Sequence, residues 1–181
     1  MTKHTNTKNS TQKATFEALK GEMGIVNIMQ TPKLTKIIVT TGLGSLRDKK
    51  KEELIVDRLT RITGQKPVKR VAKKSIANFK VRTGDVMGYQ VTLRGARMQS
   101  FFDKLVHVVF PRIKDFRGIK PSSIDEMGNI STGFKEHTVF PETSDEDARD
   151  VFGLAVNIGT SAKNTKDAET FLRYSGVPLQ K

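Results

Sequence analysis

The side chains best suited to chemistry are few in this sequence of 181 residues. There is no cysteine, which excludes disulfides, thiolate metal sites and a cysteine nucleophile. His4 lies in a polar N-terminal stretch and His107 on the polar side of a predicted helix, and neither has a partner at metal-binding spacing. His137, Glu136 and Glu142 are residue types that could together bind a metal ion. We interpret them instead as ordinary surface residues of a strand. We therefore expect no metal and no cofactor.

A pair of glycines is the nearest approach to a nucleotide-binding motif. Gly42 and Gly44 begin like a dinucleotide fingerprint, but Arg47 replaces the third glycine and no acidic residue follows at the required distance. No GxxxxGK[ST] loop occurs, and neither a Ser-His-Asp pattern nor a pair of carboxylates stands out. The sequence thus predicts a turn at these glycines, no small-molecule substrate and no enzyme activity.

Positive charge is the strongest chemical signal in the chain. Residues 1–120 contain 26 basic and 9 acidic residues, whereas residues 121–181 contain 6 and 10. Between Lys66 and Arg97, nine basic residues stand against a single acid, Asp85. Such a field attracts a polyanion, for which nucleic acid and an anionic membrane are the usual candidates. No apolar run approaches the roughly 20 residues that span a bilayer, so we expect no membrane partner.

Part of this charge is predicted to lie on one face of a sheet. Apolar and polar residues alternate on both sides of the interruption Thr83-Gly84-Asp85, which predicts two antiparallel strands with an apolar inner face. The outer face is expected to carry Asn78, Lys80 and Arg82 beside Gln90, Thr92 and Arg94. A solvated face normally mixes both charge signs and this one has no acid, so we interpret it as a binding surface.

Helices and further strands are predicted around this hairpin. Helical spacing of apolar residues predicts helices at 11–23, 48–63, 98–109, where Pro111 follows, and 164–176. Strands are predicted at 34–41, 66–71 and 154–158, with strand-like chain at 129–139. We expect an α+β fold in which residues 13–181 form a single RNA-binding domain, with a mostly antiparallel sheet and helices packed on one side. Residues 1–12 are expected to form a polar basic tail.

RNA suits the predicted surface better than DNA. No helix-turn-helix, zinc finger or basic zipper is readable, and hydrogen-bonding side chains on a sheet suit folded RNA. The exposed aromatics of an RNP-type platform are missing, so we do not expect bases to stack on the sheet. Three alternatives are an exposed basic loop without a ligand, a basic enzyme acting on a phosphorylated or nucleic-acid substrate, and a free-standing RNA chaperone. The enzyme would need a carboxylate or histidine cluster within the basic region.

Short strings of residues then give a resemblance to a known family. They are Thr63-Gly-Gln-Lys-Pro67, Ala72-Lys-Lys-Ser75, Val91-Thr-Leu-Arg-Gly95, Pro111-Arg-Ile-Lys-Asp-Phe-Arg-Gly118 and Phe140-Pro-Glu142. In one register from about Met29 to Lys181, the chain resembles the bacterial large-subunit ribosomal protein five family. The resemblance implies a cytoplasmic protein of the large ribosomal subunit that binds 5S rRNA in the central protuberance.

The resemblance also implies partners and contact residues. The partners are 5S rRNA, 23S rRNA, P-site tRNA and, across an intersubunit bridge, small-subunit ribosomal protein thirteen. Carried over by position, the residues that bind 5S rRNA are Lys33, Thr40, Gln65, Thr92 and Arg94. The loop that faces tRNA and rRNA carries Lys73, Lys74, Ser75, Asn78, Lys80 and Arg82. Two departures from the family pattern are Thr40-Thr41, where Asn-Met is common, and Gln90 in place of lysine. For the acidic segment 141–150, our hypothesis is a basic protein partner.

Overall fold

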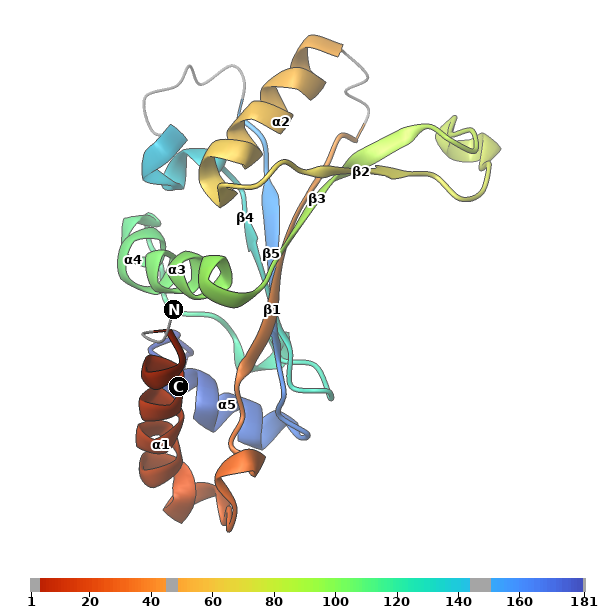
Figure 1. Cartoon of the computed structure of the whole chain (residues 1–181). Coiled ribbons are helices and arrows are strands. Elements are labelled where there is room, and N and C mark those ends of the chain that lie inside the picture. The colour runs from red at the N-terminus through yellow and green to blue at the C-terminus, as the bar shows by residue number, and fades with distance from the viewer. Residues whose placement is uncertain (1–3, 45–48, 144–150, 181) are drawn as a thin grey trace. The chain divides into compact units, whose positions relative to one another are not determined.

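The computed structural model describes residues 4–44, 49–143 and 151–180 (Figure 1). The chain divides into two compact units. The first comprises residues 1–35, 118–130 and 159–181, and the second comprises residues 36–117 and 131–158. Most of the sheet and all of the basic hairpin belong to the second unit, which is therefore the one that matters most for the predicted binding surface.

A single sheet of antiparallel strands is the centre of the fold. Within the described residues it has five strands in the order β2-β3-β1-β5-β4. The strands are β1 (Leu34–Gly42), β2 (Val68–Val71), β3 (Val86–Leu93), β4 (Ile130–Phe134) and β5 (Leu154–Thr160). The α+β class and the antiparallel sheet are confirmed, as are the strands predicted at 34–41, 66–71 and 154–158.

One face of this sheet is packed and apolar. Ile37 and Val39 of β1 and Val91 and Leu93 of β3 are fully buried, and the residues between them are only half-buried, as the two-residue period of a strand requires. The helices α2 (Lys49–Thr63) and α3 (Gly95–Lys104) lie on one side of these strands (Figure 1). Helices on one side of the sheet were predicted, and the second unit confirms it.

The helix predicted at 98–109 runs further than expected. α3 is followed without a break by a π-helical turn, Leu105–Val109, and by α4 (Phe110–Arg112). The helix ends at Arg112, one residue beyond Pro111. A π turn also shifts the helical phase, so Val108 is 37% exposed although its spacing predicts a core position.

The predicted strand at 78–82 is wrong. The neighbour of β3 on its outer side is β2, with Lys69 opposite Tyr89. Residues 77–79 form a 3-10 turn, Lys80 follows in the left-handed region at φ 52°, and Phe79 is 74% exposed. An alternation over five residues fits a reversing loop as well as a strand, so local pattern could not choose between them.

The first unit contains two helices that pack together, α1 (His4–Met23) and α5 (Thr165–Tyr174). α1 begins at His4 and not at the predicted position 11, so the backbone of residues 4–12 is helical where we expected a polar tail. α5 agrees with the predicted helix, and its inward residues are buried as expected. They are Ala168, Phe171 and Leu172.

Candidate nucleic-acid interface

Polar side chains from three strands gather on the face of the sheet opposite α2 and α3, together with Ile38 and Val68. On it, Thr40 of β1 lies opposite Gln90 of β3, and Thr92 of β3 lies opposite Ile38. Arg70 of β2 lies opposite Gly88 and so belongs to the same face by the two-residue period. We call the surface that carries Lys36, Thr40, Arg70, Gln90, Thr92 and Arg94 the open face. Its side chains are half-buried or exposed, and these six residues include no acid.

Two more of the predicted contact residues lie at the end of β3. Arg94 is exposed and follows Leu93 with extended dihedrals, φ −142° and ψ 163°, so the alternation that places Thr92 on the open face continues to it. Gln65 lies in the connection between α2 and β2, and its Nε2 donates to the carbonyl oxygen of Thr92 at 3.5 Å. α2 ends just before, at Thr63, and is followed by Gly64, whose φ of 66° favours glycine. The fold therefore joins Gln65, Thr92 and Arg94.

Lys33 is the one predicted 5S-contact residue outside the second unit. It is exposed and directly precedes β1. Its backbone is fixed by Ser161, because its N–H donates to Ser161 Oγ at 3.0 Å and its carbonyl accepts from the Ser161 N–H at 2.9 Å. Thr40, Gln65, Thr92 and Arg94 lie together in the second unit, and Lys33 belongs to the first.

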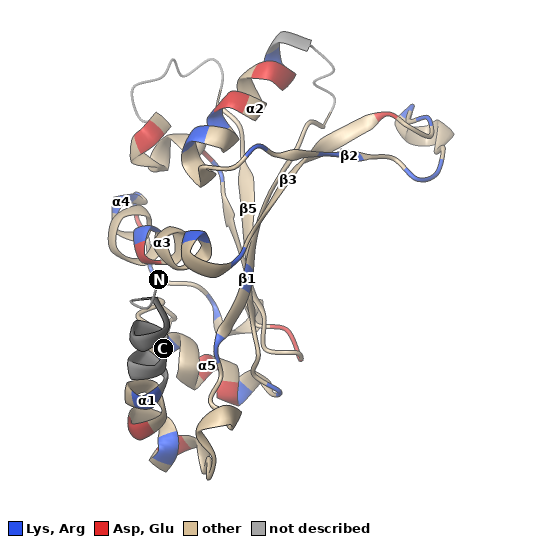
Figure 2. Cartoon of the chain, in the orientation of Figure 1, with Lys and Arg blue, Asp and Glu red and all other residues tan. Residues whose placement is uncertain are grey.

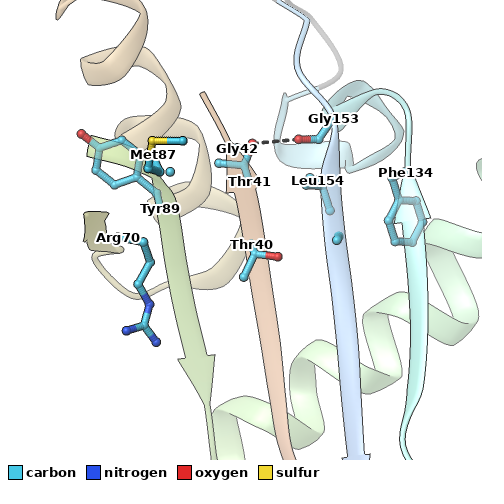
Figure 3. A pocket seen from close by; sticks show the side chains of 11 residues that line it. Thr40, Thr41, Gly42, Arg70, Met87, Tyr89, Phe134, Gly153 and Leu154 are labelled. Atoms are coloured by element: carbon cyan, nitrogen blue, oxygen red, sulfur yellow. Dashed lines mark hydrogen bonds between the residues drawn. The ribbon is translucent and has the colours of Figure 1, made fainter. Parts of the chain in front are cut away.

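A hollow of about 550 Å³ crosses the strands near Arg70 (Figure 3). Its walls include Thr40, Gly42 and Gly88, and among the described residues that line it Arg70 alone is charged. Gly88 lies opposite Gly42, and a Cβ there would collide with the carbonyl oxygen of Thr41. The close approach of β1 and β3 thus requires glycine at position 88.

The hairpin of β2 and β3 ends in a basic loop, residues 72–85, that we call the tip (Figure 1). The Ala72 N–H donates to Asp85 O at 2.8 Å, and the Arg82 N–H donates to the Asp85 carboxylate at 2.9 Å. Ile76 and Val81 form an isolated antiparallel bridge. The residues predicted to face tRNA and rRNA are all exposed on the tip. They are Lys73, Lys74, Ser75, Asn78, Lys80 and Arg82.

The charges of the interface are therefore divided between two places. Lys and Arg mark β2 and the tip, whose one acid is Asp85 (Figure 2). The predicted placement of Asn78, Lys80 and Arg82 beside Gln90 and Thr92 is wrong, because β2 occupies that position. On the β2 side of β3, the cation of the open face is Arg70. It lies there because β2 pairs with β3.

The tyrosine beneath the open face is tied to α2. Tyr89 is 3% exposed, and its hydroxyl donates to Glu52 Oε2 at 3.1 Å. Burial, the hydrogen bond to Glu52 and the charge of Glu52 together raise the pKa of Tyr89 above 10.0. Sequence reasoning missed this pair, because 37 residues separate its members.

His137 is not a surface residue, contrary to our interpretation. It is fully buried, its ring stacks on Phe152 with centroids 4.2 Å apart, and its Nδ1 accepts from the Phe152 N–H at 3.4 Å. Glu142 pairs instead with Lys104 at 2.6 Å. In the part of the chain that the structure describes, no three His, Cys, Asp or Glu side chains gather where they could hold a metal ion.

Comparison with known proteins decides the family. A model described as Ribosomal protein L5 matches residues 27–82, and a model of the C-terminal part of the same ribosomal protein family matches residues 86–179. The chain belongs to the ribosomal protein L5 family. The resemblance read from the short strings is thereby confirmed, and the two models together cover the open face and residues 72–82 of the tip.

Curated relatives agree over nearly the whole chain. Large ribosomal subunit protein uL5 of Natranaerobius thermophilus is 47% identical over 162 residues, which are 89% of this chain and 90% of the relative. The uL5 protein of Thermotoga sp. (strain RQ2) is 42% identical over 175 residues, 96% of this chain and 95% of the relative. That of Flavobacterium johnsoniae is 42% identical over 167 residues, 92% and 91% respectively.

Membership of the ribosomal protein L5 family fixes the broad function. The chain is a structural constituent of the large ribosomal subunit in the cytoplasm, and it is not an enzyme. Among the described residues, no helix has the length and apolar character needed to cross a bilayer.

Proposed function

We propose that this protein binds 5S rRNA through its open face and thereby attaches that RNA to 23S rRNA in the central protuberance of the large subunit. The observation that carries the proposal is the grouping of Thr40, Gln65, Thr92 and Arg94 in the second unit, on or beside one polar face. These residues come from three separate parts of the sequence, and the β1–β3 pairing together with the bond from Gln65 to the Thr92 carbonyl brings them together. Lys33, which precedes β1, is the fifth contact residue of the proposal.

The side chains of the open face match the chemistry of RNA. Arg70 and Arg94 suit phosphate oxygens, whereas the hydroxyls of Thr40 and Thr92 can both donate to and accept from ribose 2′-hydroxyls and base edges. Phosphate contacts supply affinity and register, and the neutral donors and acceptors supply the distinction between one RNA and another. A surface of this composition favours specific binding over a general attraction to polyanions.

The tip serves a second RNA partner in this proposal. Its basic residues Lys73, Lys74, Lys80 and Arg82 are exposed and contact P-site tRNA during translation. The bridge to small-subunit ribosomal protein thirteen is assigned to the acidic segment 141–150, on the argument that acidic residues suit a basic neighbour. Most of that segment, residues 144–150, lies outside the described residues.

The proposal is tested by filter binding of the full chain to 5S rRNA and to an unrelated RNA of equal length. At physiological salt we expect clear preference for 5S rRNA. By analogy with duplex DNA, six to ten phosphate contacts would weaken binding by roughly 10³–10⁵ between 50 and 200 mM salt. Equal affinity for both RNAs at physiological salt would contradict the proposal and favour a free-standing RNA chaperone.

A further inference from the structure

An arginine of the open face is held in place by a neighbouring amide. The Nε of Arg70 on β2 donates to Oε1 of Gln90 on β3 at 2.5 Å. Arg70 lies opposite Gly88, which has no side chain, and Figure 3 shows the arginine extending beside β3 at the level of Thr40. Both partners are thus aligned by the β2–β3 register, although neither belongs to the set of contact residues that the resemblance implies.

The pairing extends across three strands. Gln90 lies directly opposite Thr40 of β1, and Arg70 reaches Gln90 diagonally from its own position opposite Gly88, so the three side chains form a diagonal row over β2, β3 and β1. Gln90 is neutral, so Arg70 is the only cation in this row. Thr40 is one of the residues in the proposed 5S site, which makes the row continuous with that site.

The bond to Gln90 uses the Nε of Arg70 and leaves the two terminal nitrogens of the guanidinium available to a ligand. An arginine has five N–H donors in a rigid plane, and only the one on Nε is used here. Among the described residues, the two terminal nitrogens of Arg70 have no protein partner, and the side chain is exposed. These two nitrogens form the fork that binds two phosphate oxygens at once.

We propose that Arg70 is a further RNA-contact residue that grips a backbone phosphate of the bound 5S rRNA, and that Gln90 is its positioning residue. The inference rests on the proposed function of the open face. A free arginine side chain loses rotamer freedom when it binds, and its bond to Gln90 removes part of that loss before RNA arrives. Gln90 thus acts through Arg70, without adding charge.

The test measures 5S rRNA affinity of the full chain against salt concentration for Arg70→Ala, Gln90→Ala and the double variant. Arg70→Ala should weaken binding about tenfold and lower the slope of log K against log salt by about 1, the loss of one phosphate contact. Gln90→Ala should weaken binding about threefold with the slope unchanged, because the charge remains. The double variant should bind no more weakly than Arg70→Ala, because Gln90 has no role without Arg70.

Lys69 provides the matched control. It is exposed on the same strand next to Arg70, but it lies opposite Tyr89 and so faces the other side of the sheet. Lys69→Ala removes the same charge and should change affinity by less than twofold. If Lys69→Ala and Arg70→Ala weaken binding equally, charge alone matters and the assignment of Arg70 is overturned. A loss of affinity in Arg70→Ala with an unchanged salt slope also overturns the phosphate contact.

A readout on the free protein isolates the positioning role. In an NMR spectrum of the wild-type protein, the Arg70 Nε–H should be protected from exchange with water, and Gln90→Ala should remove that protection. Protection that survives in Gln90→Ala, or an affinity that does not change, overturns the role of Gln90. Failure of the proposed function would look different, because the wild type itself would then not prefer 5S rRNA over the unrelated RNA.

Discussion

The open face and the tip both carry basic and hydrogen-bonding side chains. They differ in the backbone that holds these side chains, which is a paired sheet in the first case and a loop in the second. Thr40, Gln90 and Thr92 stand on paired strands whose other face is buried core, so their positions are set by the β1–β3 register. The tip is held by hydrogen bonds within residues 72–85, but none of these residues is buried, and Lys73, Lys74 and Phe79 are exposed. A surface with a fixed pattern suits recognition of one RNA shape, whereas a weakly supported loop suits contact with a partner that comes and goes.

The largest expected effect comes from breaking the support of the open face. Gly88→Ala places a Cβ against the Thr41 carbonyl oxygen, so β1 and β3 must separate locally. We expect a loss of about 2–3 kcal/mol in the free energy of unfolding, measured by urea titration, together with weaker 5S binding. Gly133→Ala is the control, because a Cβ there meets nothing within 4 Å. Equal stability of the two variants would show that the close approach of β1 and β3 is dispensable.

The second-largest effect is a difference in 5S rRNA affinity between a variant of the open face and a variant of the tip. Arg94→Ala should weaken 5S binding about tenfold and Arg82→Ala less than threefold, because Arg94 lies beside Thr92 whereas Arg82 lies on the tip. Each variant removes one positive charge from an exposed position, so each serves as the control for the other. A filter-binding assay with the reverse order would reject the division of the basic surface.

A smaller effect, on stability, is expected at Tyr89, which is buried on the side of the sheet opposite the open face. Tyr89→Phe removes the hydrogen bond to Glu52 and should cost about 1 kcal/mol of stability at pH 8. The pKa of Tyr89 is raised in the folded protein, so its contribution is complete below the unfolded value of 10.0 and is lost as the pH rises through the folded value. Urea titrations from pH 8 to 11 should therefore show a steeper alkaline loss in the wild type than in Tyr89→Phe.

Tyr174 is the control for this pH dependence, since it is 47% exposed on α5 in the first unit. Tyr174→Phe should keep the alkaline loss of the wild type. If Tyr89→Phe and Tyr174→Phe behave alike, the pair of Tyr89 and Glu52 does not stabilise the sheet.

The smallest effect is expected at the tip. Asp85→Ala removes the carboxylate that accepts from the Arg82 N–H, in a segment that adds little to the core. We expect a change of at most about 0.5 kcal/mol in stability and less than twofold in 5S affinity. A loss of stability as large as that of Gly88→Ala would show that the tip is part of the cooperative fold, and the contrast between the two regions would fail.

How far the sequence predicts this architecture depends on the range of the interactions involved. The periodicity of β1, α2 and α5 is local, and each was predicted within a few residues. The partner of β3 was not, because pairing with β2 is a long-range choice that an alternation at 78–82 can imitate. The π turn at Leu105–Val109 was missed, because an apolar stripe at helical spacing does not distinguish a π turn from an α-helix.

The candidate site shows the same limit. The family resemblance, carried over by position, selects Thr40, Gln65, Thr92 and Arg94, and the fold gathers them in one unit. Arg70 could not be placed on the open face from sequence, because its face depends on the β2–β3 register. The burial of His137 beside Phe152 was missed because a polar residue in an irregular segment gives no periodic signal.

The most direct test of the account is to purify the full chain from its own cells and sequence the RNA that accompanies it, for three forms of the protein. The forms are the wild type, an open-face variant, Thr92→Ala with Arg94→Ala, and a tip variant, Lys80→Ala with Arg82→Ala. We predict that 5S rRNA is enriched with the wild type and the tip variant and is lost with the open-face variant. Enrichment of 5S rRNA with the open-face variant, or its loss with the tip variant, would contradict the account.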